Sequence, residues 1–148
     1  MAEWVFVQPL SSFEAVRPVD RLAAIVVDAA IEVHRHLGPA FAESIYENAL
    51  ACELALRGVL HVRQVPVYVT YKDQRVGEGR MDLVVGERLV VEIKSLPAIL
   101  PVHVSQVISY LKATRLELGL LLNFGGRRLK DGIRRVILSP MTEAPDPP

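Results

Sequence analysis

The chain of 148 residues lacks several features that mark particular classes of protein. Its single cysteine, Cys52, cannot form an intrachain disulfide, and this usage fits a reducing cytoplasm. No apolar run approaches the length of a membrane span. The first residues have neither the basic segment nor the continuous apolar segment of a signal peptide. We therefore expect a soluble cytoplasmic protein without a membrane partner, and we expect Cys52 to lie in the core.

The sequence also lacks an excess of either charge. Lys and Arg number 17, and Asp and Glu also number 17, so no overall positive field attracts nucleic acid. Any nucleic-acid site must therefore be a local patch. Hydrophobic residues make up 51% of the chain, which excludes general disorder. A chain of this length is sufficient to close a single core.

Two helices are expected in the first half of the chain. From Val19 the apolar residues recur at helical spacing, and Gly38-Pro39 ends this helix because proline cannot continue the hydrogen-bond ladder. A second helix follows at once and ends before Gly58. The apolar residues expected on its buried side are Phe41, Ile45, Ala49, Cys52 and Leu56.

The rest of the chain has the pattern of strands around a third helix, which follows Pro97 and Pro101. The expected strands are residues 62–71, 75–79, 81–85, 88–94, 118–124 and 133–138. This order predicts a mixed α/β domain with helices flanking a sheet. We expect an irregular arm over residues 1–18 that docks through Trp4 and Phe6, a single domain over 19–138, and a frayed, Pro-rich tail over 139–148.

Residues 90–95, Val-Val-Glu-Ile-Lys-Ser, form an apolar strand that carries two charges. Side chains two apart on a strand point to the same face, so Glu92 and Lys94 stand together while Val91 and Ile93 turn toward a core. Burying either charge unpaired costs several kcal/mol. Taken alone, the pattern favours a mutual ion pair or a solvated edge of the sheet.

Three further polar residues could meet Lys94, namely Asp82 on the preceding strand, Glu43 on the second helix and Gln106 on the third. A strict two-residue turn at Gly86-Glu87 would place Asp82 opposite Val91 and so separate it from Glu92. A shared site therefore requires a three-residue loop over residues 86–88 or a β-bulge in this hairpin.

Two close carboxylates repel each other unless a cation lies between them. Their oxygen atoms suit a hard divalent ion such as Mg²⁺, which keeps several waters and accepts phosphate oxygens. A lysine beside such a pair can orient a water molecule or stabilise charge that develops on phosphorus. The combination predicts metal-assisted hydrolysis of phosphodiester bonds.

The residues Asp82 and Glu92-Ile93-Lys94 resemble the D…(D/E)xK signature of the PD-(D/E)XK, or restriction-endonuclease-like, nuclease superfamily. More closely, residues 32–47, 100–103 and 123–125 resemble the small bacterial proteins called the GxxExxY family. Glu43 and Tyr46 match that motif, whereas Ala40 stands in place of its glycine. The resemblance covers residues 19–138. It implies a restriction-endonuclease-like core with a mixed central sheet flanked by helices in the order ααβββ(β)αββ.

The resemblance also implies roles for individual residues. Asp82 and Glu92 would bind Mg²⁺ or Mn²⁺, with Glu43 and the backbone carbonyl of Ile93 as further ligands. Lys94 would be the catalytic lysine. Gln106 and Tyr110 reproduce the Gln-x-x-x-Tyr helix of the helicase-associated exonuclease branch, where this helix contacts the site or the nucleic acid. His103 shares their helix face at positions i, i+3 and i+7.

Several of these residues have a simpler interpretation. Glu43 can be a solvated helix residue, and Tyr46 is better explained as a packing residue with a hydrogen-bonded hydroxyl. His103 can serve packing or substrate contact. A basic cluster near the C-terminus is either a solvated face or the phosphate-backbone site. It contains Arg127, Arg128, Lys130, Arg134 and Arg135, and Asp131 is the one acidic residue among them.

Two classes of function remain open from the sequence. The first is a Mg²⁺-dependent nuclease that acts on nucleic acid, with DNA favoured over RNA. The second is a catalytically silent nuclease-like fold that binds nucleic acid or another protein. The second class includes a homodimer module, which an exposed apolar patch on the first two helices would support.

Overall fold

The computed structural model of the protein describes residues 3–8 and 17–140, and the side chains of residues 17–138. Nine helices and strands and one short 3₁₀ helix make up this part of the chain. They are β1 (Glu3–Gln8), α1 (Pro18–Leu37), α2 (Glu43–Leu56), β2 (His61–Tyr71), β3 (Gln74–Val85), β4 (Leu89–Lys94), α3 (Pro101–Thr114), β5 (Leu118–Asn123), η2 (Leu129–Gly132) and β6 (Ile133–Pro140).

A six-stranded mixed sheet in the order β1-β6-β5-β4-β3-β2 forms the centre of the fold. Only β4 and β5 run parallel, and the other neighbouring strands are antiparallel. Every residue of β5 is buried, as expected for an uncharged central strand. The mixed sheet flanked by helices confirms the predicted fold class, which is that of a restriction-endonuclease-like core.

Both ends of the domain differ from their predicted structure. Glu3–Gln8 is not irregular but forms β1, which pairs antiparallel with β6. The expected docking of Trp4 and Phe6 concerns side chains outside the described residues. Ser139 and Pro140 belong to β6, and residues 141–148 of the expected tail also lie outside the described part. A strand can form from the mixed sequence of β1 because β6 offers it a complete backbone ladder.

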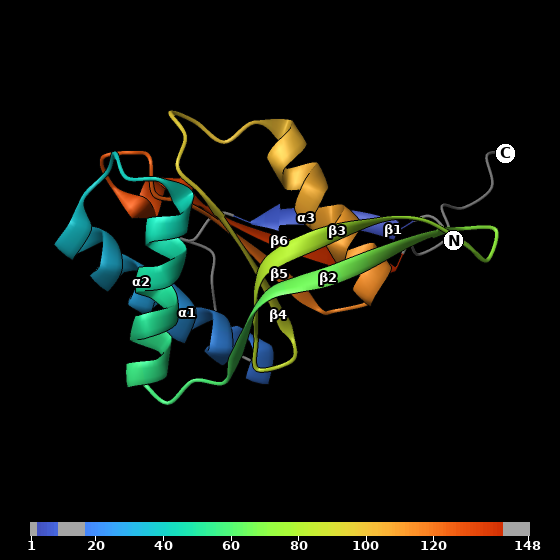
Figure 1. The fold of residues 1–148 in the computed structure, drawn as a ribbon, viewed down its shortest axis with the longest axis horizontal. Coiled ribbons are helices and arrows are strands. Elements are labelled where there is room, and N and C mark those ends of the chain that lie inside the picture. Colours follow the sequence, from blue (N-terminus) through green and yellow to red (C-terminus); the bar gives the residue numbers. More distant parts are fainter. Residues whose placement is uncertain (1–2, 9–16, 141–148) are drawn as a thin grey trace, which may run out of the picture.

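Helices cover the sheet in two layers. α1 and α2 lie together on one face, α3 lies on the other, and the tip of the β2–β3 hairpin points away from α1 and α2 (Figure 1). The period-two pattern of β4 divides its side chains between the layers. Val91 and Ile93 pack under α1 and α2, whereas Val90 packs under α3. Glu92 therefore stands on the α3 side of the sheet.

The buried side of α2 differs from the predicted one. Tyr46, Leu50 and Leu54 are buried, at i, i+4 and i+8 along the helix. Of the expected buried residues, Ile45, Cys52 and Leu56 are exposed, and Phe41 precedes the helix. The sequence offers two apolar stripes, and the fold buries the one whose Tyr46 ring stacks on Phe124 at 4.5 Å between ring centroids. The hydroxyl of Tyr46 donates to the Gly38 carbonyl, which confirms the packing interpretation.

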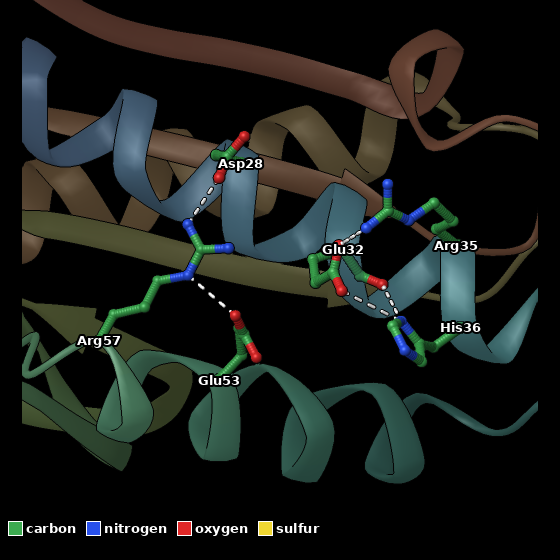
Figure 2. A network of polar contacts seen from close by, with 6 residues as sticks. All are labelled: Asp28, Glu32, Arg35, His36, Glu53 and Arg57. Carbon is green, nitrogen blue, oxygen red and sulfur yellow. Dashed lines mark hydrogen bonds and ion pairs between the residues drawn. The ribbon is translucent and has the colours of Figure 1, made fainter.

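Polar contacts also join the two helices on their outer surface. Figure 2 shows Arg57, at the end of α2, reaching Asp28 of α1 at 2.6 Å and Glu53 of its own helix at 2.9 Å. Because these groups are partly exposed, each ion pair contributes no more than about 1 kcal/mol. The network therefore adds little to the packing of α1 against α2, which their shared hydrophobic core supplies. None of the described helices is long and apolar enough to cross a membrane.

Ala40 lies between α1 and α2 with a φ of +87°. This position is outside both helices, so the helix propensity of alanine has no influence there. A positive φ favours glycine, which the GxxExxY motif has at this point, and costs an alanine roughly 1 kcal/mol.

We therefore predict that Ala40→Gly stabilises the protein by about 1 kcal/mol because it removes the strain of the left-handed backbone. The free energy of unfolding, measured by urea titration, checks this. The control is Ala42→Gly, at a position with an ordinary φ of −69°, which should not be stabilised. Equal effects of the two substitutions would contradict the prediction.

Candidate active site

The site begins with the register of the β3–β4 hairpin. Leu83 pairs with Val91, Val84 with Val90, and Val85 with Leu89, so a three-residue loop over residues 86–88 joins the strands. This confirms the predicted loop. Gly86 and Glu87 both have positive φ, which turns the chain sharply. In this register Asp82 lies opposite Glu92, and the two side chains share one face of the sheet.

The two carboxylates bind each other's strand at the point where the paired ladder ends. The Asp82 backbone N–H donates to Glu92 Oε1 at 3.0 Å, and the Ile93 backbone N–H donates to Asp82 Oδ2 at 2.8 Å. Side-chain oxygens thus take the place that backbone carbonyls have elsewhere in the sheet. Each carboxylate is fixed through one oxygen and has a second oxygen for another partner. We call Asp82 and Glu92 the acid pair.

Burial makes negative charge unfavourable in the acid pair. Glu92 is only 2% exposed, and its burial, followed by the nearby charge of Asp82, raises its pKa from 4.5 to about 8. Burial also raises the pKa of Asp82, although the hydrogen bond from Ile93 opposes this shift. Without a cation the pair holds a proton near neutral pH. The donor set therefore fits a divalent ion, which would replace that proton and neutralise both groups.

Lys94 stands two residues beyond Glu92 and is half-buried. Its charge lowers the pKa of both carboxylates, but this effect is smaller than that of burial. Within residues 17–138, the ion pairs closer than 4.0 Å do not include Lys94. Glu92 and Lys94 therefore do not form a direct ion pair. The Lys94 ammonium group is close enough to lower the pKa of both carboxylates and stays available for another partner.

The third helix brings two of the predicted residues to the same place. Gln106 Nε2 donates to the Tyr110 hydroxyl at 3.1 Å, and the Tyr110 ring lies against Gly79 of β3. Burial raises the pKa of Tyr110, and the charge of Glu92 adds to the shift. Tyr110 thus lies within electrostatic reach of the acid pair. By contrast, His103 Nδ1 accepts from the Leu100 backbone N–H at 2.8 Å, so it caps the start of α3.

A sequence model of the PD-(D/E)XK nuclease superfamily matches residues 20–136 of the chain. The chain belongs to this superfamily. The match runs from the first turn of α1 to the middle of β6 and includes the acid pair, Lys94 and the Gln106–Tyr110 helix. No curated protein and no solved structure gives a significant match.

The structure does not test the predicted role of the helix carboxylate, Glu43, in this PD-(D/E)XK domain. Glu43 is the exposed first residue of α2, and its charge ranks behind that of Glu47 among the causes that raise the pKa of Asp82. Within the described residues, no three His, Cys, Asp or Glu side chains come close enough to share a metal ion. The structure therefore joins two carboxylates directly, and Glu43 stays a prediction as a ligand.

Glu47 is a residue near the site that the sequence analysis missed. It is buried on the inner side of α2 and accepts from Arg63 Nη2 at 2.6 Å and Nε at 3.0 Å. It also accepts a hydrogen bond from Gln64. Glu47 follows Glu43 by one helical turn, and this i, i+4 spacing is the signal that could have found it.

Gln64 is a second residue near the site that sequence reasoning did not find. Its neighbours Arg63 and Val65 pair with Leu83 and Met81 of β3, so Gln64 lies beside Asp82. Its φ of +53° interrupts the ladder at this point. The apolar residues of β2 change phase at this point, from Val62 to Val65 across the polar pair Arg63-Gln64, and this break in the alternation is the signal that could have found it.

The basic cluster divides into two parts. Arg127, Arg128 and Lys130 are exposed, as a phosphate-contacting group would be. Arg135, which was grouped with them, is instead 6% exposed and forms an ion pair with buried Asp20 of α1. This corrects its predicted place on a solvated face. The run Ile-Arg-Arg-Val has no clear alternation, so the sequence did not show which arginine turns inward.

The raised pKa of Glu92 predicts a pH dependence of stability. Between pH 4.5 and about 8 the folded chain binds one more proton than the unfolded chain. This contribution to stability is therefore complete below pH 4.5 and falls by up to about 1.4 kcal/mol per pH unit as the pH rises. In metal-free buffer, Glu92→Gln should flatten this decline between pH 5 and pH 8, because it removes the titrating group. Urea titrations at several pH values measure the free energy of unfolding that checks this.

The matched control is Glu78→Gln, which removes a half-exposed carboxylate from the β2–β3 hairpin. It should keep the decline seen in the unmodified protein. A Glu92→Gln profile that runs parallel to the unmodified one would show that Glu92 is ionised in the folded protein.

Proposed function

We propose that the protein is a metal-dependent nuclease that hydrolyses phosphodiester bonds in the cytoplasm, with DNA favoured over RNA and Mg²⁺ or Mn²⁺ as cofactor. The observation that carries this proposal is the acid pair, in which Asp82 and Glu92 hold each other's strand with Lys94 beside them. Membership of a nuclease superfamily supports it. The closer resemblance to the GxxExxY family is part of the same proposal.

Asp82 and Glu92 would hold the metal ion, with the Ile93 carbonyl and Glu43 as further ligands. When bound, the ion would polarise the phosphate and lower the pKa of a coordinated water. Lys94 orients the attacking water or stabilises the negative charge that develops on the phosphate oxygens. Glu47 keeps β2 close to α2 through Arg63 and Gln64, and so supports the strand beside Asp82.

Substrate binding is assigned to two groups of residues. On α3, Gln106 is hydrogen-bonded to Tyr110, whose pKa the charge of Glu92 raises, and His103 begins the same helix face. At the C-terminal side, Arg127, Arg128 and Lys130 supply positive charge in a chain that has no overall excess of it. Together these groups would contact the phosphates on either side of the bond that is cleaved.

The activity test is cleavage of fluorescent single-stranded and duplex DNA and RNA in the presence of Mg²⁺ or Mn²⁺, the hard divalent ions that carboxylate oxygens suit. Asp82→Asn and Lys94→Ala should each lower the rate by at least about a hundredfold, because the first weakens binding of the metal ion and the second removes the positive charge beside the phosphate. Asp73→Asn, at the tip of the β2–β3 hairpin, is the control and should cleave at the normal rate. Cleavage that survives both site substitutions would exclude this site.

Metal binding has a readout that does not depend on cleavage. Mn²⁺ that binds the folded chain raises its melting temperature, by an amount that grows with metal concentration. We expect this rise in the unmodified protein at neutral pH and its loss in Asp82→Asn. Differential scanning fluorimetry checks both, and an unchanged rise in Asp82→Asn would place the bound metal elsewhere.

The second candidate function is a silent module that acts by pairing or by binding a protein. Large apolar side chains are exposed on α1, on α2 and between them, and this observation favours it. These are Ile25, Ile31, Phe41, Ile45 and Leu56, which are 40 to 78% exposed. Light scattering at micromolar concentration tests homodimerisation, and a dimer without metal-dependent cleavage would favour this candidate.

A further inference from the structure

A cavity of about 360 Å³ opens between the segment that follows β4 and the loop that follows β5. Its lining includes residues 97–99, Asn123, Arg127, Arg128, Asp131 and Arg134. The volume is sufficient for a phosphate group with part of its nucleotide. Lys130, which the sequence suggested as a phosphate contact, is not among the lining residues, and half-buried Arg134 takes its place.

The walls of the cavity are held by buried polar contacts. The side chain of Asn123, 4% exposed, accepts from the Leu96 backbone N–H at 2.9 Å and donates to the Leu96 carbonyl at 3.0 Å. His34 of α1 lies 3.1 Å from the carbonyl oxygens of Phe124 and Gly126. A side chain at Gly125 would meet the Leu96 backbone at 2.2 Å. The two segments are thus clamped together, and the cavity is formed before any ligand binds.

The charge of the cavity is positive. Arg127, Arg128 and Arg134 face one carboxylate, Asp131, which leaves two positive charges. None of these three arginines forms an ion pair within residues 17–138. The Nη1 group of Arg134 donates to the backbone carbonyls of Asp131 and Ile133, which limits its movement. The planar guanidinium group of an arginine can donate two parallel hydrogen bonds to the oxygen atoms of a phosphate.

The cavity lies next to Lys94. Asn123 is the register partner of Lys94 in the parallel β4–β5 pair, and neighbouring strands are about 4.8 Å apart. The Phe124 backbone N–H also donates to the Lys94 carbonyl at 2.8 Å. A nucleic-acid strand with a phosphodiester bond at Lys94 would therefore reach the cavity within a few nucleotides, since its charges are roughly 3.4 Å apart along the axis.

We propose that this cavity binds the terminal phosphate of a nucleic-acid strand. A phosphate monoester carries between about 1.5 and 2 negative charges and three acceptor oxygens at neutral pH, whereas an internal phosphodiester carries one charge. Two net positive charges in a preformed cavity match the monoester better than the diester. The proposal rests on the proposed function for the presence of nucleic acid, and it makes the enzyme selective for phosphorylated strand ends.

Binding of internally labelled, single-stranded DNA in EDTA tests this proposal by fluorescence anisotropy. Three oligonucleotides of one sequence carry a 5′-phosphate, a 3′-phosphate or no terminal phosphate. We expect one phosphorylated end to bind at least about tenfold more tightly than the unphosphorylated strand, because charge-assisted hydrogen bonds are lost without it. Equal affinity for all three oligonucleotides would overturn the proposal.

Arg134→Gln should reduce this preference severalfold and leave the affinity for the unphosphorylated strand nearly unchanged. Arg127→Gln should also reduce the preference, but it should weaken binding of the unphosphorylated strand as well, because Arg127 is assigned to other substrate phosphates. Arg127 is exposed, so its replacement keeps the fold even if that of Arg134 does not, and circular dichroism verifies both. The control is Arg75→Gln on the β2–β3 hairpin, which should keep the full preference. If both substitutions weaken the binding of all three oligonucleotides by the same factor, these arginines contact internal phosphodiesters only. That result would overturn the proposal.

This test is independent of cleavage because EDTA removes divalent ions. A preference for phosphorylated ends without metal-dependent cleavage supports the cavity and contradicts the nuclease function. Cleavage without any preference in binding supports the nuclease function and overturns the cavity proposal.

Discussion

The reciprocal hydrogen bonds of the acid pair are the constraint on which the rest of the site depends. They form where β3 and β4 stop pairing through their backbones, so the strands stay close enough to hold two carboxylates yet leave one oxygen of each for another partner. The same arrangement buries Glu92 and raises its pKa to about 8. Ionisation of the two buried carboxyl groups is therefore unfavourable in the folded protein. A bound cation would offset this cost, which the charge of Lys94 alone does not.

The helices on the two faces of the sheet support the acid pair in different ways. α1 and α2 bury Val91 and Ile93 and so hold β4 in place, while α3 brings Gln106 and Tyr110 to the face that carries the acid pair. Glu47 acts from α2 on the neighbouring strand through Arg63 and Gln64. On the other side, the clamped segments around Asn123 form the arginine-lined cavity. The site is therefore built from rigid elements on both sides of Lys94.

Local patterns predicted most of this arrangement. The alternation of residues 90–95 and the uncharged β5 follow from backbone geometry, which neighbouring residues fix. The hairpin register was predicted instead from the requirement that Asp82 and Glu92 share a site. Other features depend on contacts distant in sequence. The choice between two apolar stripes on α2 was decided by stacking of Tyr46 on Phe124, and the inward turn of Arg135 by Asp20. β1 forms because β6 offers a free edge. The sequence of a single helix or strand does not show which distant residue it will contact.

The central claim is that Asp82 and Glu92 bind a divalent ion in the folded protein. The most direct measurement is a crystal structure of the protein soaked in Mn²⁺, with the ion located by anomalous diffraction. The account predicts a manganese peak within about 2.3 Å of one oxygen from each carboxylate, with both backbone hydrogen bonds retained. Manganese bound elsewhere, or a Glu92 carboxylate closed onto Lys94, would contradict it.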